Sequence, residues 1–423
     1  MKYKKYPSYK DSGVEWLGEI PTEWNTSKIK HLFNLGRGRV ISLEELEDDG
    51  KYPVYSSQTK HNGILGYIKT YDFNCRQITW TTDGANAGTI FLREGKHNCT
   101  NVCGTLQPRN KSENLKFITY SLQYATTFYK RPDTNGAKIM NGEMAEIFFT
   151  YPPIDEQQQI ATYLDNATAK IDTLIEKQTN LIEILKEKRQ AVISHAVTKG
   201  INPNVPMKDS GVEWLGKIPE HWDRKRLKHC TKKIKAGPFG SSLKKDVYTK
   251  SGYKVYGQEQ VIPNNFNIGD YYISEDYFNE MRQYEVKCGD ILISCVGTYG
   301  KIALFPENGE KGIINPRLIL IRLNKIVCPQ FLEWYLKSTT IITQMSMSTR
   351  GGTMDIVNIS ILSELTISLP EMKEQQKIVN YLDDKTSKMD KLIEKANKSI
   401  ELLKEKRTAL ISAAVTGKID VRK

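Results

Sequence analysis

Few stretches of this sequence have the spacing that enzymatic chemistry needs. The run from Gly211 to Lys217 has phosphate-loop spacing, but Ile218 follows where Ser or Thr must ligate magnesium. His97, Cys99 and Cys103 lie close together, yet no second pair of ligands follows at a zinc-like spacing. No nucleophile elbow, zinc-protease motif or convincing dinucleotide loop occurs. The sequence therefore predicts no active site and no metal site.

The other residues that carry chemistry are basic and hydrogen-bonding side chains in short polar loops. Lys and Arg neutralise phosphates, whereas Gln, Asn, Arg, Ser and Thr form specific hydrogen bonds with base edges. These loops predict nucleic-acid contacts, although an ordinary solvated loop is the competing interpretation for each residue. The candidates in residues 25–153 are Ser57, Gln58, Thr59, Lys60, Thr82, Asp83, Asn86, Lys130, Arg131 and Lys138. The candidates in residues 223–370 are Ser241, Ser242, Lys244, Lys245, Gln258, Glu259, Thr298, Tyr299, Lys301 and Arg350.

Composition is consistent with such contacts without proving them. The net charge of +12 favours a polyanionic partner, which a nucleic acid, an anionic membrane or an acidic protein would each satisfy. Seven scattered cysteines without a Cys-x-x-Cys pair are typical of a reduced, cytoplasmic protein. The basic start is followed by Tyr6, Pro7 and polar residues, so we expect no signal peptide and no membrane span.

The elements that must position these loops occur twice in the chain. A phrase at residues 10–21, closed by Trp24, returns at residues 208–219, closed by Trp222. Two tryptophans around Gly and Pro turns predict a loop held by aromatic burial. Packing is therefore the favoured role of these tryptophans, and direct contact with a ligand is the alternative.

A long amphipathic helix also occurs twice, at residues 154–200 and 371–423. Each is about 45 residues and on the order of 67 Å long, so it must lie along another helix rather than fold back on itself. Its duplicate is the obvious partner, and the connectivity makes the pair antiparallel. Steps of four and three predict a heptad seam. The seam residues of the first copy are Ile160, Leu164, Ala167, Ile171, Leu174, Leu181, Leu185 and Val192, and those of the second include Ile378, Leu382, Met389, Leu392, Ala396, Leu403 and Leu410.

Two divergent bodies lie between the repeated parts. We expect a mixed α/β (α+β) fold with two such domains, at residues 1–153 and 201–370, separated by the pair of long helices in a pseudo-two-fold repeat. Apolar runs predict strands with a largely non-sequential order, at residues 77–81, 89–92, 290–294 and 318–322, and helices at 115–129 and 330–345. The stretch 82–90 aligns with 295–302, so the fold was kept while the surface residues changed.

These duplicated motifs resemble the specificity (S) subunit of type I restriction-modification systems. The resemblance rests on the Glu-Trp-Leu-Gly-x-Ile-Pro-x-x-Trp phrase, and on the Glu-Gln-Gln-x-Ile-x-x-Tyr-Leu-Asp start and Leu-Lys-Glu-Lys-Arg end of each helix. It covers essentially the whole chain. Lys385 and Lys406 on the second seam depart from a dry coiled coil.

The resemblance implies a non-catalytic subunit that reads a split, asymmetric sequence in double-stranded DNA, one half with each body. The helices would fix the unread gap between the halves. The phrases and helices would dock two methyltransferase subunits, and restriction subunits would join them. S-adenosylmethionine, ATP and magnesium would bind the partner subunits and not this chain. The residues expected to bind a partner are Trp16, Trp24, Trp214, Trp222, Gln157 and Gln375.

Two other hypotheses remain open at this point. The chain would be a scaffold or decoy if it bound methyltransferase subunits without reading DNA. A free-standing enzyme acting on nucleic acid is the third hypothesis, and the missing catalytic groups argue against it.

Overall fold

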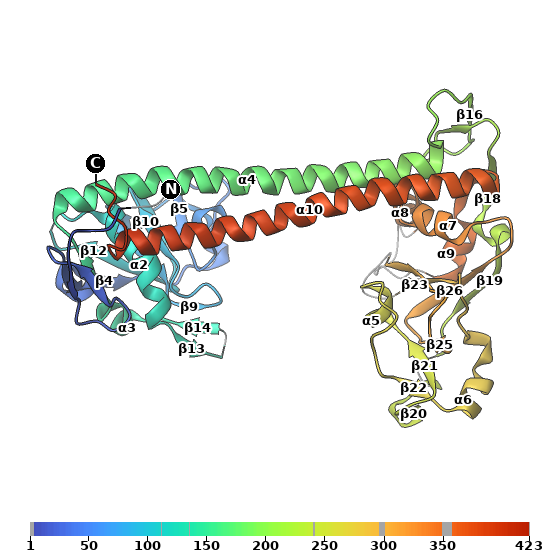
Figure 1. Cartoon of the computed structure of the whole chain (residues 1–423), viewed down its shortest axis with the longest axis horizontal. Coiled ribbons are helices and arrows are strands. Elements are labelled where there is room, and N and C mark those ends of the chain that lie inside the picture. The colour runs from blue at the N-terminus through green and yellow to red at the C-terminus, as the bar shows by residue number, and fades with distance from the viewer. Residues whose placement is uncertain are drawn as a thin grey trace. The chain divides into compact units, whose positions relative to one another are not determined.

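The computed structural model describes residues 4–110, 112–134, 136–239, 242–295, 301–348 and 358–422, without the side chains of Lys245 and residues 346–348 (Figure 1). The chain forms two compact units. Unit 1 is residues 1–179 with 397–423, and unit 2 is residues 180–396. Each unit contains one mixed α/β body and part of each long helix, so the boundary between units falls within the helices and not at their ends.

The body of unit 1 consists mainly of two four-stranded sheets. One sheet has the order β10-β8-β12-β4, with antiparallel neighbours: Ile90–Arg93, Gln77–Thr81, Cys103–Pro108 and Phe33–Arg37. The other has the order β6-β5-β11-β7, in which β5 and β11 are parallel: Ile64–Ile68, Tyr52–Tyr55, Lys96–Cys99 and Phe73–Asn74. The strand order is non-sequential, as predicted. Helix α2 (Leu115–Tyr129) covers the first sheet with a buried apolar face.

The body of unit 2 repeats the first sheet of unit 1 and the parallel pair of the second sheet with different residues. Its first sheet has the order β24-β23-β26-β19: Ile302–Leu304, Ile291–Ser294, Leu318–Leu323 and Thr231–Ala236. Its second has the order β20-β22-β21-β25, in which β21 and β25 are parallel: Tyr248–Thr249, Tyr272–Ile273, Tyr253–Tyr256 and Gly312–Ile314. Helices α5 (Gln258–Val261) and α6 (Glu275–Glu280) follow two of these strands. The expected common fold of the two bodies is therefore present, and they differ in one edge strand of the second sheet, which is β7 beside β11 in unit 1 and β20 beside β22 in unit 2.

The helix predicted at residues 330–345 is two helices, and this expectation needs correction. Helix α7 (Pro329–Leu336) ends before Ser338, and α8 (Thr339–Ser348) begins after it. The buried Ser338 hydroxyl donates to the Tyr335 carbonyl at 2.6 Å. A serine that bonds nearby backbone competes with helical hydrogen bonding, which the apolar pattern alone did not reveal.

Each body is closed by a sheet that pairs its first strand with its last. In unit 1, β3 (Asn25–Lys28) pairs with β15 (Phe148–Tyr151). In unit 2, β18 (Asp223–Arg226) pairs with β27 (Thr366–Leu369). Short helices adjoin these sheets: α1 (Ile29–Leu32), α3 (Asn141–Ala145) and α9 (Ile359–Glu364). Each body therefore starts and ends at one place, beside the start of a long helix.

The repeated phrases form equivalent hairpins. In unit 1, β1 (Tyr9–Asp11) pairs with β2 (Glu19–Pro21), and in unit 2, β16 (Met207–Asp209) pairs with β17 (Lys217–Pro219). Trp24 and Trp222 follow these hairpins and are completely buried, which confirms the predicted aromatic packing.

The C-terminal tail completes unit 1. The Tyr9 hydroxyl donates to the Gly417 carbonyl at 3.1 Å, and the Asp420 amide donates to the Lys4 carbonyl at 2.9 Å. The end of the second helix thus meets the N-terminal phrase, as the end of the first helix meets the internal phrase.

The long helices are α4 (Ile154–Lys199) and α10 (Met372–Val415), which run side by side and antiparallel within each unit (Figure 1). Asp172 pairs with Arg407 in unit 1, and Arg189 pairs with Asp390 in unit 2, both at 2.9 Å. Asp390 is the repeat of Asp172, and Arg407 is the repeat of Arg189. The internal duplication therefore relates one ion pair to the other.

The seven-residue spacing predicted for the buried seam of the helices was wrong. Leu174, Leu181 and Leu392 were placed on it, but they are 47%, 42% and 49% exposed. Burial instead recurs every eleven residues, which corresponds to 3.67 residues per turn, closer than the 3.5 of a heptad to the 3.6 of an undistorted α-helix. The buried positions that show this spacing in α4 are Ile160, Ile171, Ile182 and Ile193, and those in α10 include Ile378, Met389 and Ile411.

We expect the exposed ion pairs between the helices to contribute little to stability. Asp172→Asn should lower the free energy of unfolding by less than about 1 kcal/mol, because the pair lies at the surface and is screened by salt. Urea unfolding of the variant and of Ile171→Ala provides the comparison, since Ile171 is 6% exposed and its truncation should cost about 2–5 kcal/mol. A larger loss for Asp172→Asn than for Ile171→Ala would contradict this ranking.

Candidate nucleic-acid interface

A small three-stranded sheet brings together several of the predicted residues of unit 1. It has the order β13-β14-β9, with β9 at Asp83–Gly84, β14 at Gly136–Lys138 and β13 at Arg131–Asp133. Lys138 lies opposite both Asp83 and Arg131. The stretches 82–86 and 130–138, which are distant in sequence, therefore form one surface.

The cations of this surface differ in whether a carboxylate pairs with them. Arg131 pairs with Glu143 at 2.7 Å, and this hydrogen bond lowers the pKa of the Glu143 carboxyl. Lys138 pairs with Asp133 at 3.2 Å. Lys130 is exposed and forms no ion pair with a described residue. Lys130 is thus the cation here that can bind a phosphate without first losing a carboxylate.

The loop after β5 lies beside this surface. The Asn86 amide donates to the Ser57 carbonyl at 3.0 Å, and the Gln58 amide donates to the Ile64 carbonyl. These amide groups are therefore used within the protein. Thr59 and Lys60 are exposed.

Thr82, another predicted contact, lies inside the body. It is completely buried and donates to the Val102 carbonyl at 3.1 Å. This position contradicts the contact predicted for Thr82, because its hydroxyl has no path to a ligand at the surface. Thr82 directly follows strand β8, in which every residue is buried.

In unit 2 the predicted Gln258 and Glu259 line a hollow of about 220 Å³ at the end of β21. The Gln258 amide donates to the Ser294 hydroxyl at 2.7 Å, and Glu259 accepts from Gln260 at 2.8 Å. Lys301 and Lys244 are exposed, and Ser242 is half-buried. Ser241, Thr298, Tyr299 and Arg350, with the side chain of Lys245, lie outside the described residues.

Asn315 and Arg317 also line this hollow, and the sequence reasoning missed them. The Asn315 side chain accepts from the Arg317 amide at 2.9 Å, and Arg317 is exposed. Both lie in the turn between β25 and β26. A polar turn with Pro316 between two apolar strands was the available signal, but only the fold shows that it adjoins Gln258.

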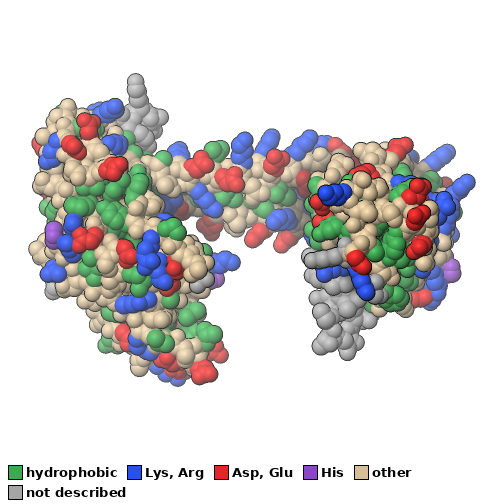
Figure 2. Space-filling model, turned by 90° about the horizontal axis from the view of Figure 1, so that it is seen from below, with side chains coloured by type: hydrophobic (Ala, Val, Ile, Leu, Met, Phe, Trp, Pro, Cys, Tyr) green, Lys and Arg blue, Asp and Glu red, His purple; other side chains and the backbone are tan. Residues whose placement is uncertain are grey.

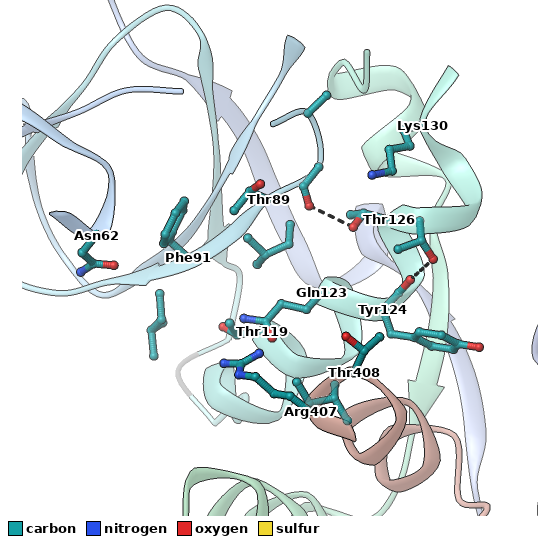
Figure 3. Close-up of a pocket in the computed structure, with 16 residues that line it drawn as sticks. Asn62, Thr89, Phe91, Thr119, Gln123, Tyr124, Thr126, Lys130, Arg407 and Thr408 are labelled. Atoms are coloured by element: carbon teal, nitrogen blue, oxygen red, sulfur yellow. Dashed lines mark hydrogen bonds between the residues drawn. The ribbon is translucent and has the colours of Figure 1, made fainter. Parts of the chain in front are cut away.

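The larger hollow in unit 1, of about 600 Å³, lies between β10, α2 and the last turns of α10 (Figure 3). Gln123, Lys130 and Arg407 are among its lining residues. The Gln123 side-chain oxygen is buried and has no hydrogen-bond partner among the described residues. The sequence reasoning did not foresee this hollow, since α2 and α10 are far apart in the chain.

Four of the six residues predicted to bind a partner are buried: Trp24, Trp222, Gln157 and Gln375. The Gln157 amide donates to the Pro152 carbonyl at 2.9 Å, and the Gln375 amide donates to the Pro370 carbonyl at 2.8 Å. Any effect of these residues on a partner would therefore be indirect.

Trp16 and Trp214 are only half-buried. Trp16 stacks on Phe128 with ring centroids 4.6 Å apart, and Phe128 is itself 48% exposed. Aromatic side chains that are partly exposed in this way are enriched at protein interfaces.

His97 lies in the core with both ring nitrogens engaged. They lie 2.9 Å from the Gln77 amide and 2.8 Å from the Gly95 carbonyl. Burial also raises the pKa of the Cys103 thiol to about 11. Among the described residues no group of His, Cys, Asp and Glu is arranged to hold a metal ion.

Charge is mixed over the surface. Figure 2 shows Lys and Arg side chains interspersed with Asp and Glu on the visible face of both units. Within the described residues, no helix is long and apolar enough to cross a membrane. Local exposed cations, such as Lys60, Lys130 and Arg317, are therefore better candidates for contact than a single basic face.

The family described as "Type I restriction modification DNA specificity domain" matches residues 21–184 and 219–402. The MjaVIII type I restriction enzyme specificity subunit of Methanocaldococcus jannaschii is 28% identical over 422 residues, covering 95% of this chain and 94% of the relative. The MpnII specificity subunit of Mycoplasma pneumoniae is 32% identical over 190 residues, covering 44% of this chain and 57% of the relative.

A solved structure shares the fold. It belongs to work on complex assembly and conformational transition of the type I R-M system, and it matches with a TM-score of 0.71 and 15% identity. The match covers 94% of this chain and 98% of the solved one.

Proposed function

Because the chain belongs to the family of type I restriction-modification DNA specificity domains, we propose that it is the DNA-recognition subunit of a methyltransferase complex. Each body reads one half of a two-part target in double-stranded DNA. The target is asymmetric, because the bodies differ. The helix pair sets the unread gap.

One observation carries this proposal: two bodies that share the strand order of the first sheet and the parallel pair of the second present different side chains at equivalent loop positions. The loop after β5 presents Lys60, whereas the equivalent end of β21 adjoins Arg317. A lysine suits a phosphate as a point charge, and an arginine suits the O6 and N7 acceptors of guanine. Different sets of donors on one scaffold are what reading two unlike half-sites requires.

The chain supplies no chemistry of its own in this proposal. Two methyltransferase subunits bind it and carry S-adenosylmethionine, and restriction subunits bring ATP and magnesium. The apolar surfaces for docking are the half-buried Trp16 with the exposed Phe128, the half-buried Trp214, and the outward-facing leucines of the helices.

The test uses the full chain in complex with its methyltransferase partner. The complex selects duplexes from a random library, and methylated adenines are mapped. We expect a two-part asymmetric motif. If no such motif is enriched while the complex stays assembled, the scaffold or decoy hypothesis is favoured instead.

Single variants then separate phosphate contacts from base contacts. Lys130→Ala should weaken binding to all DNA sequences alike and reduce the slope of log affinity against log salt by about 1. Arg317→Ala should instead reduce the discrimination between bases in one half of the motif by about 1–3 kcal/mol. Lys51→Ala is the control, because it lies exposed at the opposite end of β5 from the loop. Unchanged affinity and an unchanged motif in both variants would contradict the contacts assigned here.

A further inference from the structure

Arg93, at the end of β10, is a buried cation that neither the predicted contacts nor the ion pairs explain. It is 2% exposed, and its guanidinium lies over the Tyr55 ring at 3.6 Å and the Phe91 ring at 4.2 Å. No carboxylate among the described residues pairs with it. Burial lowers the pKa of the Arg93 guanidinium. Burying a charge without a counter-charge is unfavourable. We therefore expect the charge or the hydrogen-bond donors of Arg93 to have a role that an apolar side chain could not fill.

The second body shows what an apolar side chain does at this place. Strand register makes Phe305 the equivalent of Arg93, and Tyr256 the equivalent of Tyr55. Phe305 contacts the Tyr256 ring edge to face at 5.0 Å. Aromatic packing alone therefore fills this position of the fold, and the charge of Arg93 serves another purpose.

The guanidinium supports the loop that follows β5. Its Nη1 donates to the Asn62 carbonyl at 2.8 Å, and its Nε donates to the Thr79 hydroxyl at 3.2 Å. A Cβ on Gly63 would lie 2.9 Å from the Arg93 Nη2, so the loop backbone rests on the guanidinium.

The loop is held in an unusual conformation. His61, Asn62 and Gly63 have φ of 50°, 55° and 78°, all in the left-handed region. Side chains other than glycine adopt this region rarely, and it is maintained where the surroundings over-determine it. The Ser56 amide closes the loop on the Gly63 carbonyl at 2.9 Å. Lys60, His61 and Asn62 are exposed at the tip.

We propose that Arg93 is a positioning residue for DNA recognition, which holds the loop at residues 60–63 so that Lys60, His61 and Asn62 meet the half-site of body 1. The inference rests on the function proposed above. An asparagine amide binds adenine through two hydrogen bonds, and lysine binds guanine or phosphate. Such contacts need donors and acceptors fixed before binding, and a hydrogen bond from a buried guanidinium fixes the backbone that carries them.

The experiment compares Arg93→Met, Arg93→Lys and the matched control Phe305→Met in the full complex. Arg93→Met keeps most of the volume and loses the donors. We expect its discrimination to fall at least about tenfold in one half of the motif, with the other half unchanged. Amide exchange of residues 57–64 should accelerate by a similar factor, and the thermal midpoint should not fall. Arg93→Lys retains a charged donor, so it should restore part of the discrimination and part of the slow amide exchange of residues 57–64. Phe305→Met should leave the exchange of residues 57–64 as in the wild type.

The possible outcomes separate the two proposals. Wild-type discrimination in both halves with Arg93→Met, or unchanged exchange of the loop, would overturn the positioning role. Equal loss in both halves with a lower thermal midpoint would overturn it too, since that pattern indicates general unfolding. A wild-type complex that selects no two-part motif would overturn the proposed function and with it the recognition role. Faster loop exchange in Arg93→Met would then still show that Arg93 orders the loop.

Discussion

Replacing Gly237 by alanine is expected to lower the free energy of unfolding of unit 2 by about 3 kcal/mol or more. A Cβ at this position would lie 1.8 Å from the Asn315 carbonyl oxygen. The obstacle is backbone, which cannot rotate away as a side chain does. Gly237 also donates its amide to the Leu318 carbonyl at 2.9 Å, so moving the strand would break the hydrogen bonding between β19 and β26.

The same arrangement occurs in unit 1 at Gly38. A Cβ there would lie 2.2 Å from the Cys99 carbonyl oxygen, and the Gly38 amide donates to the Cys103 carbonyl at 3.0 Å. Gly38→Ala should therefore be about as destabilising as Gly237→Ala. Both glycines let the end of a strand lie against the backbone of a connection between the two sheets, and the connection at Gly237 carries Asn315 and Arg317.

Calorimetry and urea unfolding of the full chain measure these effects. Gly142→Ala is the control in unit 1, because a Cβ there meets nothing within 4 Å and lies in helix α3. It should be neutral or slightly stabilising, since alanine favours a helix by about 1 kcal/mol over glycine. Gly38→Ala or Gly237→Ala with the stability of Gly142→Ala would show that the two backbone crossings are not required.

The sequence was sufficient to predict elements whose burial is strong and local. Strand β8 coincides with the predicted run 77–81, and α2 coincides with 115–129. Both combine an uninterrupted periodic pattern with a clear end. The duplication also allowed one body to be aligned with the other, because equivalent strands retained their apolar character.

The seam of the helices required more than spacing in the sequence. Leu174 and Ile175 are neighbours, and both are apolar, so steps of seven and of eleven select different members of the pair. A long α-helix drifts by about 20° per heptad, and over 46 residues this drift turns Leu174 and Leu181 outward. The apolar pattern was sufficient to predict the long helix and the helix it packs against. Which leucines are buried depends on the rotation that accumulates along the helix.

The candidate interface was the least predictable part. The sheet of β9, β13 and β14 is short and polar, so only its long-range pairing shows that Asp83 and Lys138 are neighbours. The amides of Gln58 and Gln258 were predicted to face a ligand, but they bond within the protein. Residue type predicts that an amide will form hydrogen bonds and does not determine with which group.

Replacing Glu156 by alanine is expected to lower the free energy of unfolding of unit 1 by about 2–4 kcal/mol. The carboxylate is 5% exposed, and it accepts from the Tyr6 hydroxyl at 2.5 Å and from the Trp24 ring nitrogen at 3.0 Å. Both are hydrogen bonds to a charged acceptor, and alanine would leave two donors without a partner. Burial, with the bond to Glu156, raises the pKa of Tyr6, so the hydroxyl remains a donor near neutral pH.

Glu374 is the repeat of Glu156 and provides the matched control. It accepts from His221 at 2.8 Å, where the His221 side chain is 48% exposed, and the Trp222 ring nitrogen has no partner among the described residues. Glu374→Ala should therefore lower the stability of unit 2 by less than about 1 kcal/mol. Calorimetry measures both variants, and amide exchange follows the Asp420 amide, because Arg422 near Glu156 ties the tail to unit 1. Faster exchange at Asp420 in Glu156→Ala alone is expected, and equal losses of stability in the two variants would show that this buried carboxylate does not hold the termini together.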